Sequence, residues 1–340
     1  MLMIVAHHYV VNSGLLDCID AQSSLRIKDY FLLLLGWGGK TGINCFVLIT
    51  GYFMCASNIT KKKFFKLLGE VYFYKFVLWG IFFISGYEPL SAKELLKTLF
   101  PFFTVADNFT ACFLLFYLLI PFLNKLIHAM TEKEHLALLA WCMGVYVVLP
   151  SFVKANVVFN YITWFSILYV VASYVRLYPK EWFDNQKIVG IIAGISLLLS
   201  WMSVILLAFI SRHIGKSIGL AYFFVSDSNK ILALTTGVGA FLFFKNLKMG
   251  YSKAINTVAT STFGVLMIHA NSNTMRRWLW HDVCNNVGAY ETENIVVHAI
   301  ICVVAVYMIC TIIDMLRIRF VKEPVLKYLE KGLTINERKS

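Results

Sequence analysis

The chain carries little charge for its length. Only 15% of its 340 residues are Asp, Glu, Lys or Arg, whereas 59% are hydrophobic and the mean hydropathy is +0.70. A water-soluble domain has about 25% charged and about 45–50% apolar residues. So few charged residues cannot cover the surface of a water-soluble globular protein of this size. The composition therefore predicts that lipid surrounds much of the chain.

Acidic residues are scarcer than basic ones, and the common site motifs are missing. There are 19 acidic and 31 basic residues, which gives a net charge of +12. In a membrane protein such an excess collects in cytoplasmic loops and beside anionic headgroups, so we expect membrane lipid as a partner and no nucleic acid. The eight cysteines form no CxxC and no metal-site spacing, and we expect no metal. GxSxG, P-loop, dinucleotide-binding and HExxH patterns are absent from the sequence.

Apolar runs of membrane-helix length recur along the chain. A span takes about 20 apolar residues, and it must be helical because its backbone has no water to bind. Period-2 patterning, which a barrel would need, is absent. The predicted fold is therefore all-α, a polytopic membrane protein with about ten transmembrane helices in one bundle. The predicted spans are Met1–Val11, Ile43–Ser57, Glu70–Tyr87, Phe109–Ile127, Leu136–Val153, Val157–Leu177, Ile188–Ile210, Ile231–Phe244, Ile255–Ala270 and Asn294–Leu316.

The distribution of Lys and Arg predicts the orientation of these spans. With the first residue on the cytoplasmic side, the inner segments hold about 19 Lys and Arg and the outer segments about 10. This asymmetry follows the positive-inside rule, so we expect a multi-pass protein of the inner (plasma) membrane with both termini cytoplasmic. Residues 1–316 form the predicted transmembrane domain, and residues 317–340 are predicted to be a cytoplasmic amphipathic tail.

Two adjacent histidines stand in the first span, "MLMIVAHHYVV". Ionisable side chains inside a membrane are costly and are functional candidates for that reason. His7 and His8 are about 100° apart on a helix, so one neighbour faces only one of them. The face of His8 continues to Asn12, whereas the face of His7 is apolar and suits packing. We therefore predict that His8 faces a cavity, with Asn12 as a substrate-binding residue.

A third histidine, His269, ends the ninth predicted span in "STFGVLMIHANSNTMRR", with Asn273 on the same helix face. In the predicted topology the first and ninth spans run in the same direction. His8 and His269 would then lie at a similar depth, toward the outer face. We predict a shared site if the two helices are neighbours, and we include Asn273 as a substrate-binding residue.

The second span and the segment after it supply further polar candidates. In "GGKTGINCFVLITGYFM" (Gly38–Met54), the glycines favour close helix packing, while Asn44 and Thr50 are candidate substrate-binding residues. A basic cluster follows, which is interpreted either as a positive-inside signal or as point charges for the phosphates of a nucleotide-type cofactor. Its members are Lys61, Lys62, Lys63 and Lys66.

Together these segments resemble the acyltransferase-3 family of integral-membrane acyltransferases, which includes bacterial O-antigen and capsular O-acetyltransferases. The similar stretches are "MLMIVAHHYVV", "GINCFVLITGYFM", "KKKFFKLLGEVYFY", "FYLLIPFLNKLI", "FNYITWFSILYVVASYVRLYP" and "STFGVLMIHA". The resemblance implies a ten-span bundle that moves an acyl group, usually acetyl from acetyl-CoA, to a sugar hydroxyl. The family's arginine, about three turns before its essential histidine, would fall before Met1, so we expect a truncated first helix.

The resemblance also suggests roles for the candidate residues. His8 would act as the base that takes the hydroxyl proton, or would accept the acyl group covalently. His269 would orient the acceptor or stabilise the developing oxyanion. The four lysines would bind CoA phosphates, and the acceptor would be a glycan or lipid-linked saccharide. Two alternatives remain at this point: a transporter or flippase of a lipid-linked saccharide, and a non-catalytic membrane subunit.

Overall fold

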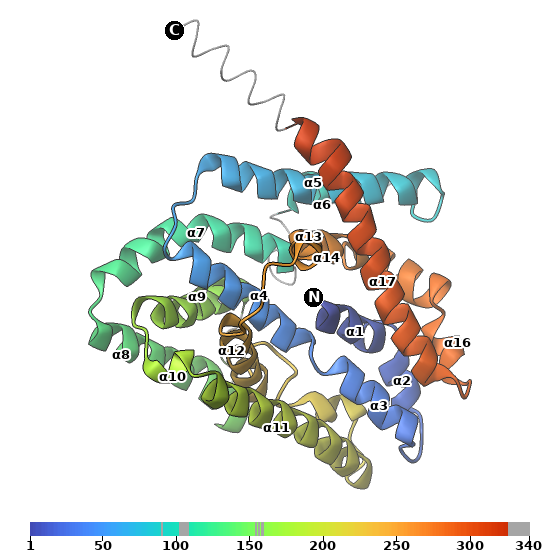
Figure 1. Cartoon of the computed structure of the whole chain (residues 1–340). Helices are drawn as coiled ribbons and strands as arrows, with labels where there is room; N and C mark the ends of the chain where they lie inside the picture. The colour runs from blue at the N-terminus through green and yellow to red at the C-terminus, as the bar shows by residue number, and fades with distance from the viewer. Residues whose placement is uncertain (90, 102–108, 154, 156, 158–159, 326–340) are drawn as a thin grey trace, which may run out of the picture.

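The protein is an irregular bundle of helices (Figure 1). The computed structural model describes residues 1–89, 91–101, 109–153, 155, 157 and 160–325. Helices make up 80% of the structure, and the described residues contain no strand. The elements in chain order are α1 (Leu2–Val11), α2 (Leu15–Asp20), α3 (Ile27–Gly36), α4 (Gly39–Met54), α5 (Lys61–Ile84), α6 (Ala92–Leu99), α7 (Phe109–Ala129), α8 (Glu132–Met143), η2 (Gly144–Val153), α9 (Tyr161–Leu177), α10 (Glu181–Asp184), α11 (Gln186–His213), η3 (Ile218–Tyr222), α12 (Ile231–Lys245), α13 (Lys253–Thr260), α14 (Thr262–His269), α15 (Asn273–Arg277), η4 (Trp278–Val283), α16 (Asn286–Tyr290), α17 (Ile295–Arg317) and η5 (Ile318–Lys322).

Several of these helices are long and apolar enough to cross a bilayer. In the described part of the chain, six helical segments meet both criteria, three of them formed by consecutive elements, and α1, α9 and α12 are shorter apolar helices. Their outward-facing side chains are largely Leu, Ile, Val and Phe, which is the surface that lipid requires. The chain is therefore a multi-pass helical membrane protein, and the predicted fold class is confirmed.

The structure extends or divides three of the predicted spans. The second begins as α3 at Ile27 and continues through α4, so its start lies sixteen residues before the predicted Ile43. Helix α5 begins at Lys61 rather than Glu70, because the Thr60 hydroxyl accepts from the Lys63 N–H and caps it. The ninth span is two short helices that meet at Ser261.

The last predicted span, Asn294–Leu316, continues further in the structure than predicted. Helix α17 runs to Arg317 and η5 continues it to Lys322. The rest of the predicted tail, residues 326–340, lies outside the described residues.

Helix α1 is packed closely against its neighbours, and this packing positions its histidines. It lies beside α3, α4 and α17. A Cβ atom on Gly39 would overlap the His7 ring, and one on Gly42 would meet Ile4 at 2.9 Å. Small residues thus allow the two helix backbones to approach, as the glycine pattern predicts.

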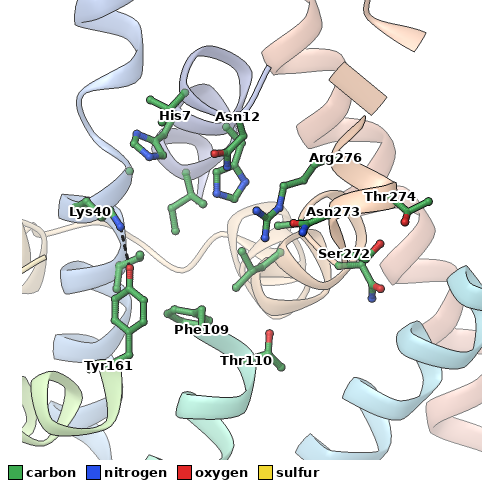
Figure 2. Close-up of a pocket in the computed structure, with 18 of the residues that line it drawn as sticks. His7, Asn12, Lys40, Phe109, Thr110, Tyr161, Ser272, Asn273, Thr274 and Arg276 are labelled. Carbon is green, nitrogen blue, oxygen red and sulfur yellow. Dashed lines mark hydrogen bonds between the residues drawn. The ribbon is translucent and has the colours of Figure 1, made fainter. Parts of the chain in front are cut away.

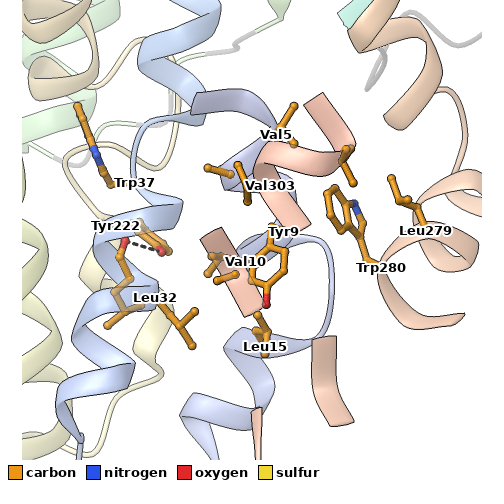
Figure 3. Packing of buried hydrophobic residues seen from close by; sticks show 14 of the residues in the cluster. Val5, Tyr9, Val10, Leu15, Leu32, Trp37, Tyr222, Leu279, Trp280 and Val303 are labelled. Carbon is orange, nitrogen blue, oxygen red and sulfur yellow. Dashed lines mark hydrogen bonds between the residues drawn. The ribbon is translucent and has the colours of Figure 1, made fainter. Parts of the chain in front are cut away.

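The opposite side of α1 is fixed by aromatic and aliphatic contacts. Figure 3 shows Val5, Tyr9 and Val10 packed among side chains of the surrounding elements, including Leu32, Trp280 and Val303. The Tyr9 hydroxyl is hydrogen bonded to Nδ1 of His298 on α17 at 2.7 Å. Because Tyr9 directly follows His8, this bond also fixes the rotation of α1 about its axis.

A buried charged cluster joins α5, α14 and α17. Asp314 accepts hydrogen bonds from the Tyr74 hydroxyl at 2.6 Å and from Nε of Arg317 at 2.8 Å. Arg317 also pairs with Glu70, at 3.1 Å. Asp314 lies against Gly264 on α14, five residues before His269, so the cluster sets the distance between α14 and α17.

We predict that Gly264→Ala destabilises the protein. The added methyl group would overlap the Asp314 carboxylate, and overpacking of this kind costs about 1–3 kcal/mol. Gly80→Ala on α5 is the matched control, since a Cβ there has no neighbour within 4 Å and Ala is the better helix former. Thermal unfolding in detergent should show a lower Tm for the first variant and an equal or higher Tm for the second. Equal Tm values for the two variants would contradict close packing of α14 on Asp314.

Candidate active site

A cavity of about 900 Å³ opens where several helix ends meet. Its wall includes the last turns of α1 and α14, the first turns of α4, α7 and α9, and the second half of α5. We call this side of the bundle the cavity face. The opposite side, where α4 ends and α5 begins, is the lysine face. Figure 2 shows Lys40 and Tyr161 on one wall, Asn273 and Arg276 on the facing wall, and His7 and Asn12 between them.

His8 and His269 lie side by side at this cavity. The centres of their rings are 5.1 Å apart, although they come from opposite ends of the chain. His8 lines the cavity, and His269 is fully buried next to it. Nδ1 of His8 and Nε2 of His269 are both buried and have no hydrogen-bond partner among the described residues. The predicted neighbourhood of the two histidines is therefore present in the structure.

The hydrogen bonds of His269 define which of its nitrogens carries a proton. Its Nδ1 lies 2.6 Å from the Val265 carbonyl oxygen, which only accepts, so Nδ1 donates. A neutral imidazole has one donor and one acceptor nitrogen, so Nε2 of neutral His269 is an acceptor. A neutral His269 can accept a proton or a hydrogen bond at Nε2, but it has no N–H there to offer an oxyanion.

His7 also contacts the cavity, which the helix-face argument did not predict. Its Nδ1 donates to the Gly36 carbonyl oxygen at 2.6 Å, and its ring packs on Gly39. These contacts hold the ring in the wall between α1 and the junction of α3 and α4. His7 is thus a packing residue, as predicted, whose ring edge also reaches the cavity.

The predicted polar residues divide into two groups. Asn12 and Asn273 line the cavity. Asn44 does not: its Nδ2 donates to the carbonyl oxygens of Ser228 and Ala233, and its Oδ1 accepts from the Trp164 indole. These contacts occupy the Asn44 amide and explain its burial without a substrate.

Thr50 lies outside the cavity as well. Its hydroxyl donates to the Phe46 carbonyl oxygen, one turn earlier in α4, at 3.0 Å. This is the usual way in which a threonine satisfies its hydroxyl inside a helix. Asn44 and Thr50 are therefore structural in this fold.

The four candidate lysines lie at the lysine face, away from the histidines. Lys61, Lys62, Lys63 and Lys66 are exposed on the first turns of α5. The same helix reaches the cavity at Lys75, about 20 Å further along its axis at 1.5 Å per residue. Among the described residues, the cavity wall includes none of these four lysines.

Aromatic rings in mutual contact occupy the space between the two faces. Phe109, in the cavity wall, packs on Phe113 at 5.8 Å between ring centres. Phe113 contacts Tyr117 at 6.4 Å, and Tyr117 stacks on Phe64 at 6.5 Å. Phe64 follows Lys63 in the chain. We call Phe109, Phe113, Tyr117 and Phe64 the ring series; it leads from the cavity to the lysine face.

The cavity also contains cations that the sequence analysis did not select, namely Lys40, Lys75, Lys97 and Arg276. Lys75 lies inside the predicted third span, Glu70–Tyr87, and it is only 9% exposed in the second half of α5. Arg276 stands in the segment quoted for His269, and its position after the span made it look like a loop charge. Burial lowers the pKa of Arg276 from its ordinary value, because desolvation penalises the charged form. Arg276 was detectable as a charge seven residues after His269, and Lys75 as a charge inside a predicted span.

The family comparison covers nearly the whole chain, and residues 1–315 match the acyltransferase-3 family model, described as an acyltransferase domain. The chain belongs to the acyltransferase-3 family. The match includes α1 with both histidines, the cavity helices and α17. Membership shows a membrane acyltransferase, so it favours acyl transfer over saccharide transport. Neither the search of curated proteins nor the search of solved structures found a match.

We predict that Asn44→Ala lowers stability, whereas Asn12→Ala does not. The first change removes the acceptor of the Trp164 indole N–H and the donor to two carbonyl oxygens, and each buried group that is left unsatisfied costs about 1–3 kcal/mol. The Asn12 side chain faces the cavity, where water replaces it. Thermal unfolding of the two variants in detergent measures the difference. If both variants unfold at the wild-type temperature, the structural assignment of Asn44 is wrong.

Proposed function

We propose that this acyltransferase moves an acyl group, most simply acetyl, from acyl-CoA to a hydroxyl of a cell-envelope or exported polysaccharide. The observation that carries the proposal is the pair of unpartnered imidazole nitrogens, on His8 and His269, beside a cavity in a family of acyltransferases. A buried polar atom without a partner is costly, and a catalytic role is one of the reasons for which a protein retains it.

His8 is the proposed base. Its Nδ1 is buried, which leaves Nε2 as the nitrogen available to a hydroxyl in the cavity. The hydroxyl proton passes to Nε2 while the oxygen forms its bond to the acyl carbon. The carbon–sulfur bond then breaks, and the leaving thiolate takes the proton from His8. Base catalysis of this kind contributes about 10²–10⁴-fold to the rate.

His269 is proposed to fix the tautomer of His8 rather than to stabilise an oxyanion. For Nε2 of His8 to act as a base, Nδ1 must carry the proton. The acceptor nitrogen of neutral His269 lies on the adjoining ring and suits a proton on Nδ1. The role first considered for His269, at the oxyanion, needs a donor that its neutral ring does not have.

The lysine face is the proposed entry for the donor. Four exposed ammonium groups surround the first turns of α5, and a helix N-terminus itself attracts phosphate. The thioester end of CoA would then reach about 20 Å along α5 to the cavity, following the ring series. In this arrangement the lysine face is cytoplasmic, as are both termini, and the saccharide acceptor approaches from the cavity face.

We predict that His8→Ala reduces acyl transfer by about 10²–10⁴-fold at unchanged expression. His213→Ala is the control, since His213 is an exposed histidine at the end of α11. The measurement is acetylation of a polysaccharide acceptor by membranes that contain each variant, supplied with labelled acetyl-CoA. Near-normal transfer by the His8 variant would rule out His8 as the base.

We predict that the change of Lys61, Lys62, Lys63 and Lys66 to Gln raises KM for acetyl-CoA by at least about tenfold and leaves kcat unchanged, because phosphate contacts are charge-assisted. Acetyl-pantetheine, which has no phosphate, should show the same KM with wild type and variant. Lys248→Gln with Lys253→Gln serves as the control on exposed lysines elsewhere. An equal rise in KM for both donors would indicate distortion of α5, and no rise would place the phosphates elsewhere.

A further inference from the structure

The described wall of the cavity is more basic than acidic. Four basic side chains line it, namely Lys40, Lys75, Lys97 and Arg276, together with two acidic ones, Glu88 and Glu94. Both carboxylates already have partners. Glu94 pairs with Lys97 at 2.5 Å, and Glu88 accepts from the Thr274 hydroxyl at 2.9 Å. Among the described wall residues, the remaining three cations therefore have no carboxylate as a close partner.

Arg276 is the clearest case. Its Nε is buried without a partner, and the side chain forms no hydrogen bond or ion pair with any described residue. Figure 2 shows it extending from α15 toward Asn12 on the opposite side of the cavity. Its charge acts on the rings of both His8 and His269. The next residue, Arg277, is exposed and donates to the Tyr87 hydroxyl at 3.3 Å, so the two arginines differ in environment.

Lys75 and Lys40 extend the positive charge around the cavity. Lys75 is 9% exposed, and Glu94, a carboxylate that acts on it, is already paired with Lys97. Lys40 donates to the Tyr161 hydroxyl at 2.9 Å, and its closest carboxylate, Asp227, lies 4.0 Å away. Lys75 and Arg276 have no carboxylate partner among the described residues, and such cations in a membrane bundle cost several kcal/mol unless an anion compensates them. A ligand with negative charge would supply that compensation.

We propose that the acceptor is an anionic saccharide, a uronic acid or a phosphate-bearing sugar, whose acid group is bound by Arg276 and Lys75 while its hydroxyl faces His8. This inference rests on the proposed function for the role of the ligand as acceptor. The donor phosphates have the same chemistry, but the proposed lysine site for them lies about 20 Å away along α5. Arg276 binds a carboxylate or phosphate through two parallel N–H groups, which also orients the sugar.

The test uses two glycosides that differ only at one carbon. Methyl β-D-glucopyranoside has a neutral CH₂OH group where methyl β-D-glucopyranosiduronate has a carboxylate. Their binding to the full chain in detergent is measured without any acyl donor, so failure of acyl transfer does not affect the result. We expect the uronate to bind at least about tenfold more tightly than the neutral glycoside, as a charge-assisted contact requires.

Variants identify the residues responsible. Arg276→Gln and Lys75→Gln should each remove most of the preference and leave the affinity for the neutral glycoside unchanged, whereas Arg276→Lys should retain part of it. Arg277→Gln is the matched control and should keep the full preference. Equal binding of the two glycosides by wild type would overturn the proposal, as would a preference that survives in both Gln variants.

Competition distinguishes the two sources of an anionic ligand. Free CoA and pantetheine are each added against bound uronate. We expect neither to displace it when the uronate is held near its own Kd. If CoA displaces the uronate and pantetheine does not, and Arg276→Gln abolishes that displacement, the cations bind donor phosphates and the proposal is wrong.

Discussion

Polar atoms buried in a membrane bundle are stable only when they have partners, and this constraint organises the whole structure. Asn44 satisfies it through two carbonyl oxygens and an indole, and Oδ1 of Asp314 through Tyr74 and Arg317. Beside the cavity the same requirement is not met by any described residue on the two facing imidazoles and on Arg276. Unpartnered buried atoms also occur away from the cavity, on Ser261 and Trp280 for example, so it is the position at the cavity that makes these three side chains candidates for ligand binding.

Much of the fold could be predicted from apolar runs, because each span must be helical and long enough to cross the membrane. The ends of these apolar runs were less informative about where each helix begins. Lys61 to Lys66 look like a loop by hydropathy, yet Thr60 caps a helix that includes them. Ile27–Gly36 was missed because Trp37 and Gly38 interrupt the pattern, although the chain continues into α4 with only a brief break.

The candidate site was predictable in part. His8 and His269 are ionisable residues, which are costly inside a membrane, and the predicted topology places them at a similar depth. In the structure the centres of their rings are 5.1 Å apart. Asn44 has the same polar character, but no sequence pattern shows that Ser228, Ala233 and Trp164 occupy its amide. Lys75 and Arg276 were not selected for a related reason. Whether a carboxylate lies beside either side chain depends on helices that are distant in the sequence.

The ring series has a consequence for the membrane itself. A cavity of about 900 Å³ cut into a bundle admits water to its depth, and a continuous water column across the bilayer would conduct protons and discharge the membrane potential. Phe109, Phe113, Tyr117 and Phe64 fill the line from the cavity floor to the other face with ring contacts of 5.8 to 6.5 Å. Hydrophobic constrictions of this kind dewet. The rings therefore close this line to water while no acyl donor occupies it, so a deep cavity need not make the bundle leak protons.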